Sequence, residues 1–336
     1  MVETAVRGLP EHGIELCHVN LRLSRSHADI GGWRPGKLLA VLDACGHALA
    51  ARFTARCDTL YYVPAPAKRG ALYRDWLVLA LCRPFFPRLV LHFHNGGLGE
   101  WLRAGLTAPE RALTQRLLGG ADLALVLTPA LRADADALGA RRVAVVPNGL
   151  AAPAPASGPA RDPGLVLFLG QVSAAKGALD LLAAVRRLRA DGRDVRVVFA
   201  GAADADVAAA LAAARAEDPD CGELAGFVGP AAKAALLARC ACLALPTRYA
   251  HEAQPLVLLE AFAADRPVVA TRWRGIADTV PDPAALVAPG DVTALAAALR
   301  RTLDAPPPTG EMRRWFESRF TRERHLAALA DALRSV

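Results

Sequence analysis

The stretch that decides the fold is CLALPTRYAHEAQPLVLLEAF, residues 242–262. Its first four residues are apolar and precede Pro246, a pattern typical of a buried parallel strand that ends at Leu245. A helical pattern begins at Leu256, directly after Pro255, and proline suits the first position of a helix. A strand, a loop and a helix in this order form the repeating unit of an α/β fold.

The same alternation of short apolar runs and longer amphipathic segments continues along almost the whole chain, which predicts parallel sheets covered by helices. One predicted helix covers residues 37–49, whose apolar residues keep a helical spacing. The strands predicted in the first half are residues 15–21, 59–63, 89–93, 123–127 and 143–146. Those predicted in the second half are residues 165–169, 195–200, 242–245 and 267–271.

Length and a proline-rich stretch together predict two domains. A chain of 336 residues exceeds what one hydrophobic core usually serves. After Pro147-Asn148-Gly149 comes a stretch rich in Ala, Pro and Gly, which can form neither a helix nor a central strand. We therefore expect Rossmann-like, doubly wound α/β domains at residues 1–150 and 151–310, with a cleft between the carboxyl ends of their sheets.

Composition narrows the class of partner. The chain is 53% hydrophobic and 22% charged, as expected for a folded globular protein. Its net charge of +7 favours anionic partners such as nucleotide phosphates or anionic lipid head groups. The basic residues are scattered rather than clustered, which argues against a dedicated nucleic-acid-binding protein.

The sequence also predicts a cytoplasmic location. Its seven cysteines are odd in number and widely spaced, a pattern that indicates reduced and mostly buried thiols. The first residues include charges without an apolar stretch between them, and no apolar run reaches the length of a membrane span. We therefore expect a soluble, cytoplasmic protein, and leave open a peripheral contact with an anionic membrane.

Two carboxylates flank the predicted start of the helix at Leu256. Glu252 precedes this start and Glu260 lies inside the helix. A helix start offers unpaired amide groups and the positive end of a dipole, which suits a diphosphate. The two carboxylates could then accept hydrogen bonds from the hydroxyls of a sugar and of a ribose. On spacing alone, an acidic first turn with an exposed Glu explains the pattern equally well.

The wider context decides between these two interpretations, because the chain resembles a retaining glycosyltransferase of family four, within glycosyltransferase group 1. Residues 252–261 resemble the family's E-x7-E motif. Residues 167–170, followed by Lys176-Gly177, resemble its strand, phosphate loop and helix start. Residues 145–149 and 266–270 and the pair Gly275-Ile276 fit the family as well. The resemblance runs from about residue 14 to residue 300 and implies the two-Rossmann-domain GT-B fold.

The resemblance implies roles for individual residues. Glu252 would contact the donor sugar, Glu260 would hold the ribose hydroxyls, and Lys176 would neutralise the diphosphate as a point charge. The first domain would then serve the acceptor and the second the nucleotide-sugar. The other donor-binding residues implied in this way are Gly31, Gly32, Gly170, Gln171, Gln254, Pro255 and Leu256.

The strand predicted at residues 89–93 ends in His94-Asn95-Gly96-Gly97. In the family a histidine after this strand faces the reacting sugar, and His94 fits that position. His92 lies within the strand and is predicted to pack in the core. The family lacks an obvious protein nucleophile, and the departing phosphate oxygen is proposed to take the acceptor's proton on the same face, so we expect His94 to position the sugar.

The chain departs from the family directly after the strand glycine, where Gln171 replaces the usual arginine. A neutral amide cannot supply the second positive charge. Arg248 or Arg274 could take its place, or the enzyme could be slower than its relatives, or the chain could have shifted toward binding alone.

No cofactor and no metal ion are expected, because no His, Cys and carboxylate residues have metal-ligand spacing. Asp134 and Asp136 have the letters of the D-x-D motif that holds a divalent cation in the other main glycosyltransferase fold. They lie in an amphipathic helical pattern, so we interpret them as a solvated helix face.

The final segment, residues 311–336, carries an apolar face at helical spacing that must be buried. In the resembling fold the last helix crosses back to the first domain, and we expect the same here. The residues of this face are Trp315, Phe316, Phe320, Leu326, Leu329 and Leu333.

Together these patterns predict transfer of a sugar from a nucleotide-sugar, with UDP or GDP as the nucleotide, to a glycan, lipid-linked or small-molecule acceptor. Two alternatives remain open on the same fold. One is a nucleotide-sugar 2-epimerase, which would need acid and base groups around the second carbon of the sugar. The other is a nucleotide-sugar-binding protein without catalysis.

Overall fold

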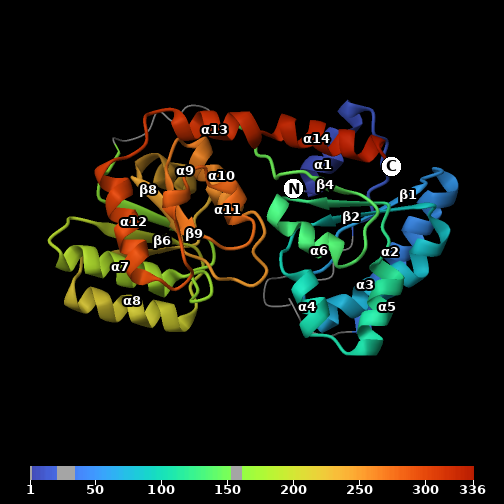
Figure 1. Cartoon of the computed structure of the whole chain (residues 1–336), viewed down its shortest axis with the longest axis horizontal. Helices are drawn as coiled ribbons and strands as arrows, with labels where there is room; N and C mark the ends of the chain where they lie inside the picture. The colour runs from blue at the N-terminus through green and yellow to red at the C-terminus, as the bar shows by residue number, and fades with distance from the viewer. Residues whose placement is uncertain (1, 21–34, 153–160) are drawn as a thin grey trace. The chain divides into compact units, whose positions relative to one another are not determined.

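The computed structural model describes residues 2–20, 35–152 and 161–336 (Figure 1). The described chain divides into two compact units. The first unit runs to Pro147 and also includes His325–Val336, and the second unit is Asn148–Arg324. The sequence grouped residues 311–324 with the C-terminal helix, whereas here they belong to the second unit.

The first unit contains a four-stranded parallel sheet of order β1-β2-β3-β4. Its strands are β1 (Thr59–Tyr62), β2 (Arg88–Phe93), β3 (Leu123–Val126) and β4 (Val143–Val145). Its helical elements are α1 (Val2–Gly8), η1 (Leu9–His12), α2 (Pro35–Thr54), α3 (Arg69–Cys82), η3 (Arg83–Phe85), α4 (Leu98–Ala104), α5 (Ala108–Leu118), η4 (Pro129–Leu131) and α6 (Arg132–Asp136).

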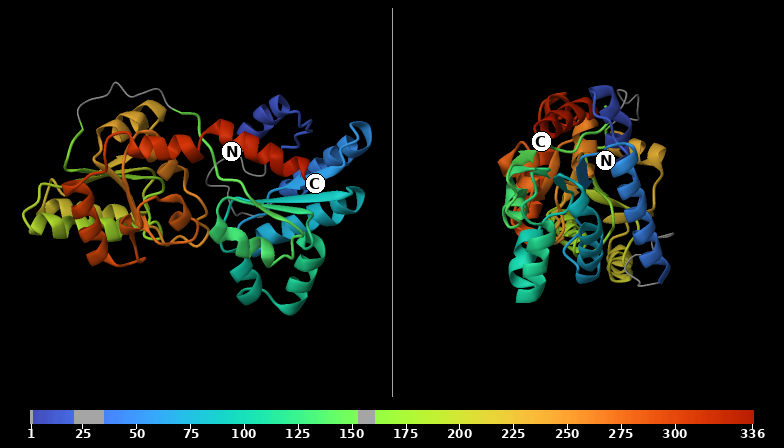
Figure 2. Two further views of the ribbon diagram at one scale, coloured as in Figure 1. Left: turned by 45° about the horizontal axis from the view of Figure 1, so that its top comes forward. Right: turned by 90° about the vertical axis from the view of Figure 1, so that its right-hand side faces the viewer.

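Helices cover both faces of this first sheet (Figures 1 and 2). On one face Val90, Leu123 and Leu125 form a core with Leu329 of α14 (Arg322–Arg334), whose residues from His325 onward belong to this unit. On the opposite face α2 and α3 pack together through a second apolar cluster. The strands predicted at residues 59–63, 89–93, 123–127 and 143–146 all form, with ends that differ by one residue.

The strand predicted at residues 15–21 is wrong for its described part, because residues 15–20 form no strand. Exposure does alternate at the start of this segment, since Glu15 and Cys17 are exposed whereas Leu16 is partly buried. Such alternation specifies an extended backbone, but a strand also needs a neighbouring strand to pair with. The described strands give this segment no such partner.

The second unit contains a six-stranded parallel sheet of order β10-β9-β8-β5-β6-β7. Its strands are β5 (Leu165–Leu169), β6 (Arg196–Ala200), β7 (Gly222–Gly226), β8 (Cys242–Leu245), β9 (Val268–Thr271) and β10 (Leu286–Val287). Its helical elements are α7 (Ala178–Ala190), α8 (Ala205–Glu217), α9 (Pro230–Arg239), α10 (Leu256–Ala263), α11 (Ile276–Thr279), η5 (Pro283–Ala285), α12 (Val292–Asp304) and α13 (Glu311–Arg319).

The order of this second sheet reverses between β5 and β8. The chain runs from β5 through β6 to β7 on one side and then returns to place β8 on the other side of β5. Helices α7, α8 and α12 lie on one face of the sheet, and α9, α10 and α13 lie on the other (Figure 1). Open α/β sheets bind ligands outside the carboxyl ends of the strands at such a reversal.

The aromatic residues of the final segment contribute to the core of the second unit rather than the first. Phe316 is fully buried, Phe320 is almost so, and Trp315 packs against the same cluster. Leu329 and Leu333 pack in the first unit instead. The apolar face predicted for residues 311–336 is therefore divided between the two units.

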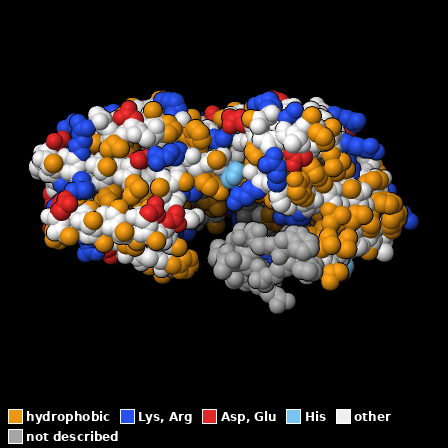
Figure 3. Space-filling view, turned by 90° about the horizontal axis from the view of Figure 1, so that it is seen from below, with side chains coloured by type: hydrophobic (Ala, Val, Ile, Leu, Met, Phe, Trp, Pro, Cys, Tyr) orange, Lys and Arg blue, Asp and Glu red, His pale blue; other side chains and the backbone are white. Residues whose placement is uncertain are grey.

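The surface agrees with scattered charge rather than a single basic stripe. On the face shown in Figure 3, Lys and Arg side chains lie at separate places on both units, and hydrophobic side chains gather on the first unit. Within residues 2–20, 35–152 and 161–336, no helix has the length and apolar character needed to span a membrane.

Replacement of Phe316 by alanine should destabilise the second unit by about 3–5 kcal/mol, because it removes a fully buried aromatic ring. Denaturant unfolding of the purified variant measures this loss. Phe227→Ala is the matched control, since Phe227 is 89% exposed in the same unit. Equal stability of the two variants would contradict the packing of α13 described above.

Candidate functional site

The loops after β5 and β8 touch each other at the reversal of the second sheet. Gly177 has a φ of +80°, and a Cβ atom placed on it would lie 2.1 Å from the carbonyl oxygen of Pro246. The backbone amide of Arg248 also donates to the carbonyl of Ala175 at 2.9 Å. Any side chain at residue 177 would push the two loops apart, so this glycine sets their distance.

The side chains of Lys176 and Glu252 meet where these loops touch. Lys176 Nζ lies 2.6 Å from Glu252 Oε2, and their side chains are 23% and 9% exposed. The hydroxyl of Thr247 donates to the same carboxylate oxygen at 3.2 Å. Lys176 Nζ also lies 4.8 Å from the ring centre of Tyr249, a distance suited to a cation–π contact. The sequence predicted Lys176 and Glu252 as site residues, and the structure brings them together.

This arrangement can bind a group that carries both negative charge and hydroxyls. Each member of the pair neutralises the other in a half-buried position, so neither charge is left without a partner. A phosphate would compete with Glu252 for the ammonium of Lys176, whereas a sugar hydroxyl would donate to Glu252. Tyr249 and Thr247 were not predicted, and their only signal in the sequence is their place directly after a buried strand.

The second carboxylate, Glu260, projects from α10 and pairs with a different lysine. Lys233 Nζ of α9 lies 2.6 Å from Glu260 Oε1, with side chains 37% and 21% exposed. Glu260 is the fifth of the eight residues of α10, and its side chain stays partly exposed beside this lysine. Lys233 was missed because it lies 27 residues away on another helix, and nothing in its own segment indicates this contact.

The start of α10 is held by a buried amide network. The side-chain oxygen of Gln254 accepts from the backbone amide of Asn148 at 2.7 Å, and its amide group donates to Thr279 at 3.4 Å. The side chain of Asn148 donates back to the carbonyl of Gln254 at 3.2 Å. The helix starts at Leu256, as the sequence predicted, and Pro255 is its N-cap rather than its first helical residue. The side chain of Gln254 thus holds the loop in place.

Gly170 and Gln171 follow β5 directly and are both exposed. Gly170 has a φ of +122°, and no atom lies within 4 Å of the Cβ that a larger residue would carry there, so open space adjoins its backbone. The amide of Gln171 donates to Asp204 at 3.1 Å. Of the two arginines considered in its place, Arg248 pairs with Asp180 at 2.6 Å and Arg274 lies over the ring of Trp273.

His94 directly follows β2 in the first unit and is largely shielded from solvent. Its ring lies 4.1 Å from that of His92, measured between centroids. Burial, with a contribution from the charge of His325, lowers the pKa of His94 to about 4. His92 is 1% exposed and bonds the hydroxyl of Tyr61, so its prediction as a core histidine is confirmed.

The interpretation of Asp134 as part of a solvated helix face is wrong. Asp134 is 4% exposed and accepts from the backbone amides of Gly97 and Gly99, at 2.9 and 2.7 Å. Asp136, two residues further on, is exposed as predicted. The local sequence pattern could not distinguish Asp134 from Asp136. The difference arises because the carboxylate of Asp134 accepts a hydrogen bond from the amide of Gly99, 35 residues earlier in the chain.

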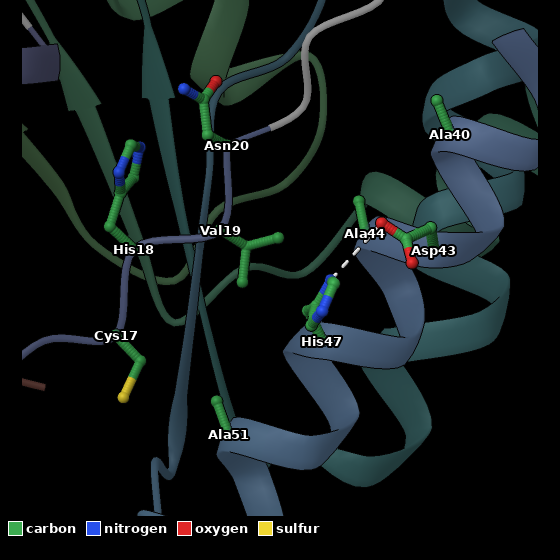
Figure 4. A pocket seen from close by; sticks show the side chains of 9 residues that line it. All are labelled: Cys17, His18, Val19, Asn20, Ala40, Asp43, Ala44, His47 and Ala51. Atoms are coloured by element: carbon green, nitrogen blue, oxygen red, sulfur yellow. Dashed lines mark ion pairs between the residues drawn. The ribbon is translucent and has the colours of Figure 1, made fainter.

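Two further parts of the first unit bear on the predicted site. Gly31 and Gly32 lie outside the described residues. A pocket of about 600 Å³ lies between residues 17–20 and α2 (Figure 4). His47 and Asp43 stand one turn apart on that helix, 3.4 Å from each other, and face the pocket. This pocket contains none of the site residues predicted from the sequence.

The sequence analysis led us to expect no bound metal ion. Across residues 2–20, 35–152 and 161–336, no three His, Cys, Asp or Glu residues are grouped so that they could hold a metal ion. At the sheet reversal, Lys176 provides an ammonium group and the start of α10 provides the positive end of a helix dipole.

A neutral His94 has a consequence for stability. An unfolded histidine titrates near pH 6.5, whereas His94 in the folded protein titrates at about 4. Between these values the unfolded chain binds the additional proton, so stability should fall as the pH falls from about 6.5 to about 4. Denaturant unfolding at pH 7 and pH 5 measures this loss, and His94→Gln should reduce it. A ring titration of His94 near pH 6.5 by NMR would contradict it.

Comparison with known proteins shows what this chain is similar to. Residues 163–305 match the family model described as glycosyl transferases group 1. A glycogen synthase from Mycobacterium tuberculosis (strain CDC 1551 / Oshkosh) is 27% identical over 277 residues, which are 78% of this chain and 66% of that protein. The chain thus spans slightly less than two thirds of the length of this curated relative.

Solved structures share the fold. Sucrose-phosphate synthase from Thermosynechococcus elongatus has a TM-score of 0.69 at 19% identity, covering 94% of this chain and 82% of that one. HepE from Anabaena, in complex with UDP, has a TM-score of 0.66 at 20% identity, covering 89% and 82%. Both sheets of this chain are Rossmann-like, and its fold is GT-B. The resemblance to the group 1 glycosyl transferases lies in the second unit, which contains the matching residues 163–305.

Proposed function

We propose that this protein is a retaining glycosyltransferase that moves a sugar from a UDP-sugar to a hydroxyl of an acceptor. The observation that carries the proposal is the Lys176–Glu252 pair at the carboxyl ends of β5 and β8. The pair lies at the reversal of the sheet, where such folds bind nucleotides, and inside the segment that matches the family model.

Lys176, Glu252 and Glu260 each have one role in this proposal. Lys176 gives up its contact with Glu252 and neutralises the diphosphate, so the leaving group is stabilised as negative charge develops on it. Glu252 is then released to accept a hydrogen bond from a hydroxyl of the transferred sugar. Glu260, from the side of α10, accepts from the ribose hydroxyls. The loop at Gly170 leaves room for the phosphates to approach the backbone.

The transfer requires no protein nucleophile. The bond between the anomeric carbon of the sugar and the phosphate oxygen breaks, and a bond from that carbon to the acceptor oxygen forms on the same face. The acceptor's hydroxyl proton passes to the departing phosphate oxygen, so the products are the glycosylated acceptor and the nucleoside diphosphate. His94 is neutral at pH 7 and positions the sugar through hydrogen bonding.

Two observations support the choice of a uridine nucleotide in the donor and of Arg248 as the second positively charged residue. HepE, which shares the fold, has solved structures in complex with UDP and in complex with UDP-glucose. We therefore take uracil as the base of the donor nucleotide. Gln171 is neutral, and we propose that Arg248 supplies the second positive charge. Its backbone amide already bonds the loop that carries Lys176.

The two carboxylates should respond differently to substitution. Glu260→Ala should weaken UDP binding by about 1.5–3 kcal/mol, because a charged acceptor for the ribose is lost. Glu252→Gln should leave UDP affinity nearly unchanged and reduce turnover of a UDP-sugar. Calorimetric titration with UDP and a turnover assay across a panel of UDP-sugars measure the two effects. Glu311→Ala, an exposed carboxylate of the same unit, is the control.

These outcomes also test the assignment of roles. If UDP binds the Glu260→Ala variant as tightly as it binds the Glu311→Ala control, the ribose contact is misassigned. If Glu252→Gln weakens UDP and UDP-sugar binding equally and leaves turnover intact, the sugar contact is misassigned.

Turnover should survive chelation of divalent cations. In this proposal Lys176 and the amides at the start of α10 carry the charge of the diphosphate, so no cation is needed to bridge it. The assay compares rates with EDTA, with Mg²⁺ and with Mn²⁺. Loss of activity in EDTA and recovery with either metal would show that the leaving group is stabilised in another way.

A further inference from the structure

One buried carboxylate has no place in the mechanism above. Asp134 of α6 is 4% exposed, and its two oxygens accept the backbone amides of Gly97 and Gly99. Both glycines are buried as well. A buried charge is retained only where hydrogen bonds compensate its lost solvation, so this contact is a fixed part of the first unit.

The two amides belong to the segment that follows His94. Strand β2 ends at Phe93, and its neighbour β3 fixes it by pairing up to that residue. Helix α4 begins at Leu98, between the two glycines that Asp134 binds. The three residues from His94 to Gly96 are therefore held at one end by the sheet and at the other by Asp134.

The backbone of this segment depends on the glycines. Gly97 has a φ of +85°, which other residues rarely adopt. A Cβ atom on Gly99 would lie 2.8 Å from the carbonyl oxygen of Ala133 and 3.1 Å from Asp134 Oδ1, so α4 and α6 approach each other closely here. The short separation of these helices lets a side chain as short as aspartate reach both amides.

Resting on the function proposed above, we infer that Asp134 is a positioning residue for His94. It holds the chain after β2 so that the imidazole stays in contact with the ring of His92, at 4.1 Å between ring centroids and tilted by 42°. A carboxylate offers only acceptors and can satisfy both amides at once, whereas an asparagine would present a donor to one of them. Asp134 itself contacts neither the sugar nor the nucleotide.

The test compares Asp134→Asn with Asp136→Asn. Both variants remove one carboxylate from α6, but Asp136 is exposed. The comparison therefore separates the effect of a lost charge on α6 from the effect of losing the hydrogen bonds to Gly97 and Gly99. The donor probe is UDP-glucose, whose slow hydrolysis reports turnover, and free UDP reports binding to the second unit. The ring signal of His94 in a ¹H–¹³C NMR spectrum reports the environment of the imidazole directly.

The inference predicts that Asp134→Asn lowers kcat by about 10- to 100-fold, as expected for a displaced positioning group. The Kd for UDP should stay within about 2-fold of that of the unaltered protein, because the nucleotide site lies in the other unit. The His94 signal should shift in Asp134→Asn and stay in place in Asp136→Asn. Equal kcat values and equal His94 signals in the two variants would overturn the inference.

Hydrogen exchange on the unaltered protein provides a test that does not depend on folding of a variant or on activity. Slow exchange of the Gly97 and Gly99 amides would support their hydrogen bonds to Asp134. Exchange at the rate of an exposed loop would overturn the inference. If the protein neither binds UDP nor hydrolyses UDP-glucose, the proposed function fails. The exchange rates and the His94 signal still decide whether Asp134 holds the loop.

Discussion

The chemistry of the second unit depends on the contact between Gly177 and the carbonyl of Pro246. The strands that carry these loops, β5 and β8, are neighbours in the sheet although their last residues, Leu169 and Leu245, are 76 positions apart in the sequence. Because no side chain stands between the loops, a lysine after one strand and a glutamate after the other come within hydrogen-bonding distance. A sheet without the reversal would not bring these two loops together.

Both carboxylates of the E-x7-E stretch are paired with lysines, and this sets what a ligand must do. Glu252 contacts Lys176 and Glu260 contacts Lys233, each at 2.6 Å. A ligand with hydroxyls alone would have to displace an ammonium group without offering it a negative charge in return. In the proposed function, a ligand that brings phosphate and hydroxyls together would replace both halves of such a pair, and a sugar joined to a phosphate is a ligand of this kind.

The sequence predicted the parts of the fold that depend on local pattern and missed those that depend on partners. Continuous apolar runs gave β5 and β8 with correct ends, whereas β7 escaped notice because two of its five residues are glycine. The extended segment 15–20 has the alternation of a strand but no described strand beside it. In the site, Lys176 and Glu252 followed from motifs, while Lys233 and Asp134 act through contacts 27 and 35 residues away.

Burial rather than residue type decides what the histidines of the first unit can do. At neutral pH an imidazole with a pKa of about 4 carries no positive charge, so His94 cannot supply charge to a departing diphosphate. It can still donate one hydrogen bond and accept another, in directions fixed by its backbone and by the neighbouring ring of His92. In the proposed function, the lysine of the second unit would therefore provide charge, and the shielded histidine of the first would provide direction.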